Sequence, residues 1–200
     1  MDEMRALFVA VVLALPFGVY VLVALMRKAS YRSCAARLGA AYVERGWFAP
    51  GLIAGEGFEI EPEQVGKSYR TRVRVAVGSS PGRFLLRPGF FGESPDWSFA
   101  RVAATRINRV FLWEVAIGGF VEPTEEQRAA LLGWLGRGSL RSDTHPSLAA
   151  AKIREITIKD GFVAVSFRGI VSDFARLQRT LEALRLLAPD ERSAKAREIA

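Results

Sequence analysis

Cysteine and histidine are almost absent from this 200-residue chain, which contains one of each, Cys34 and His145. A single cysteine cannot form an intramolecular disulfide, so the fold cannot depend on a disulfide framework. One histidine and one cysteine also fall short of the four such ligands that a structural zinc site usually takes. The scarcity of cysteine and histidine therefore excludes a fold held together by intramolecular disulfides and argues against a zinc centre.

Lysine is also scarce, and arginine supplies most of the positive charge. The net charge is +7 and the isoelectric point is about 10.1. A basic balance of this kind favours anionic partners, namely lipid headgroups, nucleic acid or acidic proteins, without choosing among them.

Catalytic and cofactor motifs are missing as well. His145 precedes Pro146 in a polar stretch, 137–147, which is typical of a turn, whereas a hydrolytic triad places its histidine beside a nucleophile and a carboxylate. Gly51-x-x-x-Gly55-x-Gly57 is followed by a strand pattern and not by a helix, so it indicates a turn and not a phosphate loop. We predict no catalytic residue, no metal and no cofactor.

The chain does contain one long apolar run, residues 6–26, with no charged residue in it. As a helix it would be about 30 Å long, which matches the hydrocarbon core of a bilayer, so the run predicts a transmembrane helix. A cleaved signal peptide would have a shorter apolar region and a small-x-small cleavage site. A buried core helix rarely runs this long without a polar face. We therefore expect an uncleaved anchor.

Positive residues flank the run unequally. Arg5 alone precedes it, whereas Arg27, Lys28, Arg32 and Arg37 follow it. Because the flank richer in Lys and Arg usually faces the cytoplasm, we expect a single-pass protein of the inner cell membrane with a cytoplasmic domain. The four basic residues after the run would also attract anionic headgroups, each by roughly 1 kcal/mol.

Composition and spacing divide the chain into five parts. They are an N-terminal flank (1–5), the transmembrane helix (6–26), a juxtamembrane helix (27–46), a soluble domain (47–188) and a charged tail (189–200). Tyr31, Cys34, Leu38 and Tyr42 follow one another at helical spacing in the third part. Trp47 and Phe48, which follow this helix, would either pack on the domain, which is the more common role, or lie at the bilayer surface.

The soluble domain has the pattern of an α+β fold with a largely antiparallel sheet and helices covering one face. Alternating apolar residues predict strands at 57–63, 68–77, 83–87, 109–117, 153–158 and 162–168, with a loop at 88–97. Asp160-Gly161 predicts the turn of a hairpin. The Thr124…Gln127 capping box opens one helix, which ends near Gly136, and Ser172 is expected to cap the last helix, which ends before Pro189.

An arginine row is the strongest functional signal in the domain. Arg70, Arg72 and Arg74 alternate with apolar residues, which places them on one face of a strand over about 13 Å. Such a row is suited to phosphate groups of lipid or nucleic acid. No interleaved aromatic residues and no recognition helix accompany it, which argues against nucleic acid.

Glutamates offer a structural explanation for the same row. Glu59, Glu61 and Glu63 alternate along the preceding strand. On a neighbouring strand they would form cross-strand salt bridges with the arginines, and the row would then be structural.

The segments between 35 and 188 together resemble an uncharacterised family of bacterial membrane-anchored domains. The matching features are Ala36-Arg37-Leu38-Gly39, the glycines 51, 55 and 57, the strand 72–75, the run 111–118, the helix 124–132, the late hairpin and the final helix. Family members often have Gly-Asp and Phe-Asp near the middle strand, where this chain has Ile107-Asn108-Arg109 and Phe111-Leu112. The resemblance implies the architecture and brings no activity.

Three functional hypotheses follow. The first is a non-enzymatic single-pass membrane protein whose domain binds the lipid bilayer, another membrane protein or a cytoplasmic protein. The second is an anion-binding module that uses Arg70, Arg72 and Arg74. The third is a hydrolase that uses His145.

Overall fold

The computed structural model describes residues 2–47, 49–66, 68–91, 96–110, 113–137 and 141–187. Within them the chain forms an α+β fold with one antiparallel sheet of nine strands and four α-helices. The α+β class and the antiparallel sheet are therefore confirmed.

Fifteen elements make up the described part of the chain. They are α1 (Asp2–Arg37), β1 (Ala41–Val43), β2 (Leu52–Gly55), β3 (Phe58–Val65), β4 (Ser68–Ala76), β5 (Phe84–Leu86), η1 (Pro88–Phe90), η2 (Trp97–Phe99), β6 (Ala100–Val110), β7 (Trp113–Val121), α2 (Glu125–Arg137), α3 (Arg141–Ala150), β8 (Ile156–Lys159), β9 (Phe162–Arg168) and α4 (Phe174–Leu187). The strand order is β1-β2-β3-β4-β9-β8-β5-β6-β7, so the late hairpin β8–β9 joins the two earlier groups of strands.

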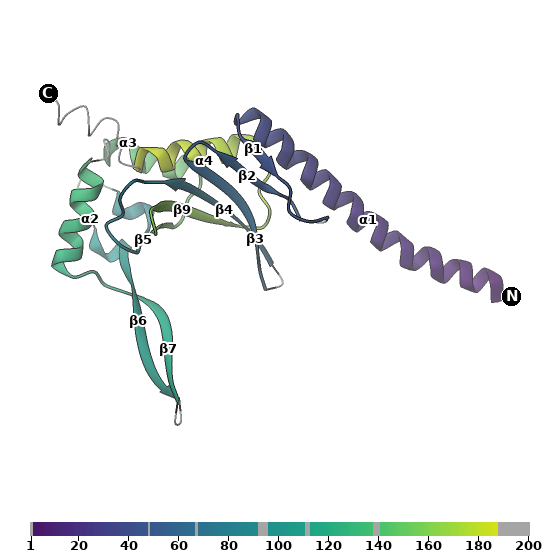
Figure 1. Ribbon diagram of the computed structural model, residues 1–200, viewed down its shortest axis with the longest axis horizontal. Coiled ribbons are helices and arrows are strands. Elements are labelled where there is room, and N and C mark those ends of the chain that lie inside the picture. The colour runs from purple at the N-terminus through teal and green to yellow at the C-terminus, as the bar shows by residue number, and fades with distance from the viewer. Residues whose placement is uncertain are drawn as a thin grey trace.

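The helices cover one face of the sheet. Helix α4 packs against β4 and β9, while the C-terminal end of α1 packs against β1 and β2 (Figure 1). The N-terminal part of α1 and the β6–β7 hairpin both project away from this body (Figure 1). The opposite face of the sheet is not covered by a helix in the described part of the chain.

Alternation in the strands and periodicity in α4 build the core. In β4 the side chains of Thr71, Val73 and Val75 are buried, and the arginines between them lie on the other face. Leu177, Leu181 and Leu184 of α4 are buried against this surface, as expected from their helical spacing. Ala188, the last member of the predicted stripe, lies outside the described residues.

Two local signals in the sequence are confirmed. The backbone N–H of Thr124 donates to Oε1 of Gln127 (2.9 Å), and the N–H of Gln127 donates to Oγ1 of Thr124 (3.4 Å), which is a capping box at the start of α2. Asp160 and Gly161 connect β8 to β9 with φ angles of 52° and 77°, as a tight hairpin turn requires.

The predicted helix over 27–46 is shorter than expected. Helix α1 ends at Arg37, and the strand β1 follows where the helix was expected to continue. Gly39 adopts a φ of +63°, and the N–H of Ala40 donates to the carbonyl oxygen of Ala35. This left-handed glycine ends the helix and turns the chain into the sheet.

The strand predicted at 109–117 is wrong in another way. The chain reverses inside it, because β6 and β7 pair from Val102↔Val121 to Val110↔Trp113. The connecting residues, Phe111 and Leu112, lie outside the described residues. No glycine or proline marks the reversal, so the apolar, strand-forming residues indicated one continuous strand.

Two further boundaries differ from expectation. The polar loop predicted at 137–147 contains much of α3, and this helix is anchored in the core by its own residue Leu148, which is fully buried. The last helix is capped by Asp173 and not by Ser172, because Oδ1 of Asp173 accepts hydrogen bonds from the N–H groups of Ala175 and Arg176.

The predicted transmembrane helix at 6–26 is overturned. Among the residues that the structure describes, no helix is both long and apolar enough to cross a membrane. The side chains of residues 5–13 of α1 lie outside the described part of the chain. The prediction of a single-pass membrane protein, which depended on this helix, is therefore also wrong. The expected location, with the domain facing the cytoplasm, stays a prediction.

Candidate functional site

The projecting part of α1 is apolar and faces water. We call residues 14–26 the apolar segment. Its large side chains that are more than half exposed are Leu15, Phe17, Val19, Tyr20, Leu22, Leu25 and Met26. Successive helical residues are rotated by 100°, so these side chains lie on every side of the helix and not along one stripe.

The C-terminal part of α1 is built into the domain. Tyr31 and Ala35 are buried in the core, and the thiol of Cys34 donates to the carbonyl oxygen of Ser172 (3.1 Å). Burial raises the pKa of the Cys34 thiol. The helix is therefore attached to the chain segment that precedes α4.

Thr71 is the centre of a buried hydrogen-bond network beneath α1. Its Oγ1 donates to the carbonyl oxygen of Gly169 (2.9 Å) and accepts from the N–H of Val171 (2.8 Å). Since its only proton is used, Thr71 accepts from the hydroxyl of Tyr31 at 3.4 Å. One side chain thus joins α1, β4 and the segment after β9.

We expect Tyr31 to make the protein sensitive to alkali. Burial raises the pKa of Tyr31 to about 12, from an ordinary value of 10.0. Below pH 10 both the folded and the unfolded chain keep this proton. Above pH 10 only the unfolded chain loses it, so stability falls as the pH rises towards 12. The Tyr31→Phe variant should lose less stability between pH 8 and pH 11, by roughly 1 to 2 kcal/mol in urea unfolding. Equal losses in the two proteins would contradict this expectation.

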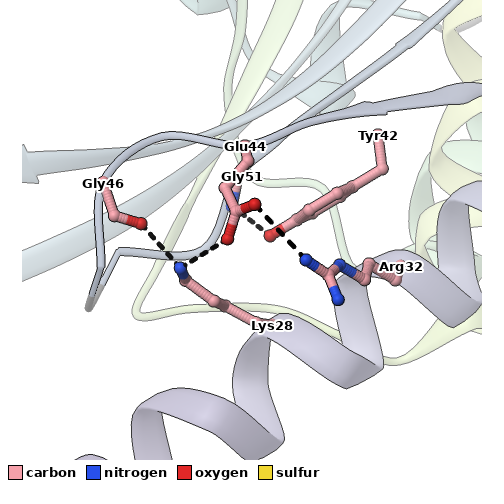
Figure 2. Close-up of polar contacts among 6 residues, drawn as sticks. All are labelled: Lys28, Arg32, Tyr42, Glu44, Gly46 and Gly51. Atoms are coloured by element: carbon pink, nitrogen blue, oxygen red, sulfur yellow. Dashed lines mark hydrogen bonds and ion pairs between the residues drawn. The ribbon is translucent and has the colours of Figure 1, made fainter.

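Lys28 joins α1 to the loop after β1. Its Nζ donates to Oε1 of Glu44 (2.8 Å) and to the carbonyl oxygen of Gly46 (2.6 Å), as Figure 2 shows. The side chain of Lys28 is only 9% exposed although it is charged. A charge that is so far removed from water requires such partners, so this contact fixes the loop on the helix.

Glu44 is the shared carboxylate of this contact. Its other oxygen lies 3.4 Å from the guanidinium of Arg32. The hydrogen bond from Lys28 holds the pKa of Glu44 below its usual value, so the carboxylate stays charged in mild acid. The stabilising effect is present above the ordinary pKa of a glutamate and is lost as the pH falls through the lowered value.

A hydrogen bond between Tyr42 and Gly51 joins the two ends of the segment that connects β1 to β2. The hydroxyl of Tyr42 accepts a hydrogen bond from the N–H of Gly51 (3.0 Å), and Arg32 lies over the Tyr42 ring (Figure 2). A Cβ at position 51 would collide with the carbonyl oxygen of Val43 and with the Tyr42 ring. Only glycine fits here, so Gly51 is held against Tyr42, whose ring lies beside Arg32 of α1.

The four basic residues predicted to flank the membrane have different roles in the fold. Lys28 and Arg32 bind Glu44, and Arg37 lies 3.7 Å from the centre of the Phe174 ring of α4. Arg27 is exposed on α1, next to the end of the apolar segment. Three of the four thus fix α1 to the domain.

The arginine row lies on the uncovered face of the sheet and is largely paired. Strands β3 and β4 place Glu59, Glu61 and Glu63 opposite Arg74, Arg72 and Arg70. Arg72 forms an ion pair with Glu63 (3.0 Å), and Arg74 forms ion pairs with Glu59 and Glu61. Arg70 is exposed and lies beside Arg168 of β9. Anion binding by this row stays a prediction.

His145 is exposed on α3. A hydrolytic role for it stays a prediction. In the described part of the chain, no group of three or more Cys, His, Asp and Glu side chains is placed to hold a metal ion.

Sequence reasoning missed the loop contact and the Thr71 network. Both join residues far apart in the chain, such as Lys28 with Glu44 and Thr71 with Val171, and no local pattern marks them. The position of Lys28, two residues after the apolar run, was the one available signal, and it indicated a membrane flank instead.

Comparison of the chain with family models, with curated proteins and with solved structures found no match to any of them. The resemblance to a family of membrane-anchored domains therefore stays a prediction.

Proposed function

We propose that this protein is a non-enzymatic partner-binding module that is held at a lipid surface by the apolar segment of α1. The observation that supports the proposal is the exposure of large apolar side chains on all sides of a helix whose other end is fixed in the domain. Exposed apolar surfaces of this size mark sites that bind a partner or a lipid.

The distribution of these side chains favours lipid over a partner helix. A partner helix buries one apolar stripe, and the remaining surface of such a helix is polar. The apolar segment has no polar face, and apart from Ala24, which is buried, and Val21, which is half-buried, a hydrocarbon layer can contact its residues.

Charge supports the same partner. Arg27 is exposed at the end of the apolar segment, and the chain has a net charge of +7. A surface containing anionic lipid would attract this end of the molecule and bring the apolar segment into contact with it.

The contacts between α1 and the domain would let a lipid-bound helix orient the domain. Lys28 and Tyr31 fix α1 to the domain, through the loop after β1 and through β4, so a lipid-bound helix would hold the domain in a set orientation. The uncovered sheet face, with its rows of glutamate and arginine, would then be available to another protein. Anion binding by the arginine row is less favoured, because Arg72 and Arg74 already have carboxylate partners.

Flotation with vesicles tests the proposal. We expect the full chain to float with phosphatidylcholine vesicles containing 30% phosphatidylglycerol, and to float less completely with phosphatidylcholine alone at low salt. Protein that stays at the bottom of the gradient with both kinds of vesicle would overturn the proposal. A soluble oligomer of the 22.0 kDa chain that hides the apolar segment and does not float would also overturn it.

A further inference from the structure

One aromatic side chain lies at the boundary between the apolar segment and the charged end of α1. Trp47 is 87% exposed, which is the highest exposure among the large apolar side chains that the structure describes. A tryptophan exposed to this degree leaves most of its ring in water, which is unfavourable unless something covers it.

The loop contact fixes the position of Trp47 along the helix. The preceding residue, Gly46, accepts a hydrogen bond from Lys28, which follows the last apolar residue, Met26, by two positions. Two residues correspond to about 3 Å along a helix axis. Figure 2 shows the carbonyl group of Gly46 directed at Lys28. Trp47 therefore lies close to the level at which the apolar segment ends.

Charged groups lie at the same level. Arg27 is exposed there, and the side chain of Arg32 is 58% exposed one turn further along α1. An aromatic ring with a polar N–H, next to cations and at the end of an apolar helix, matches the layer between acyl chains and headgroups.

We propose that Trp47 is an interfacial lipid contact, which inserts at the boundary between headgroups and acyl chains of an anionic bilayer and sets how far α1 enters it. This inference rests on the proposed lipid attachment and goes further by naming the residue that fixes its depth. Lys28 acts as a positioning residue, since it holds the loop at this level.

Quenching by brominated lipids tests the inference. The full chain is bound to phosphatidylcholine–phosphatidylglycerol vesicles whose acyl chains carry bromine, and tryptophan fluorescence is compared with that on unbrominated vesicles. We expect the wild-type protein to lose part of its fluorescence, and the Trp47→Phe variant to bind the vesicles while losing most of this bromine-sensitive part.

Trp97→Phe provides the matched control. Trp97 packs edge-on against Phe90, within the domain, so removing it should leave the bromine-sensitive fluorescence in place. Quenching that is equal in the wild type and in Trp47→Phe, with both proteins bound, would overturn the inference and leave the lipid attachment intact. Failure of the wild-type protein to bind would overturn both.

Discussion

Replacing Leu15, Phe17 and Leu22 with glutamine is expected to release the protein from anionic vesicles without unfolding the domain. All three side chains are more than half exposed on the apolar segment, so the folded domain does not depend on them. Transfer of each from water to hydrocarbon is worth roughly 1.5 to 3 kcal/mol, so the vesicle partition coefficient should fall by at least about a hundredfold. Partition measured by flotation, and thermal unfolding of the same samples, check the two parts of this expectation.

A matched control separates this effect from a general loss of surface apolarity. Val43, Val65 and Phe120 are also large, apolar and exposed, but they lie on strands of the sheet. Replacing these three with glutamine should leave vesicle binding near the wild-type level. Equal loss of binding in both triple variants, or wild-type binding by the α1 variant, would contradict the role of the apolar segment.

Thr71→Val is expected to give a large loss of stability. Valine has nearly the same shape as threonine, but it leaves the N–H of Val171, the carbonyl of Gly169 and the hydroxyl of Tyr31 without their buried partner. An unsatisfied buried group costs roughly 1 to 3 kcal/mol, so we expect a loss of about 2 to 4 kcal/mol in the free energy of unfolding. For a chain of this size, that lowers the melting temperature by roughly 5 to 15 °C.

Thr71→Ser is the control for this variant. Serine keeps the hydroxyl and removes one methyl group, which should cost only about 1 kcal/mol. Urea unfolding of the three proteins at neutral pH makes the comparison. A valine variant as stable as the serine variant would show that the network beneath α1 contributes little.

Strand alternation and local capping motifs could be recognised from sequence because they depend on neighbouring residues. Thr71, Val73 and Val75 indicate which face of β4 is buried, and Asp160-Gly161 indicates the late hairpin. Salt bridges between the glutamate and arginine rows could also be considered from sequence, as an alternative to anion binding, because both rows repeat every two residues.

Features that depend on tertiary contacts were not predictable in this way. The end of α1 is decided by Gly39, whose left-handed conformation leads into a strand only because β2 is there to pair with it. Helix α3 contains Pro146, and the burial of its residue Leu148 in the core is a tertiary contact that no local pattern shows. The contact of Lys28 with Gly46 depends on a loop that the strand pair β1–β2 positions.

One flotation experiment tests the central claim most directly: wild type, the Leu15/Phe17/Leu22 variant and the Val43/Val65/Phe120 control are spun in parallel with vesicles containing 30% phosphatidylglycerol. We expect the wild type and the control to float and the α1 variant to stay at the bottom while remaining folded. A wild-type protein that stays at the bottom, or an α1 variant that floats with it, would contradict the proposal that the apolar segment holds this domain at a lipid surface.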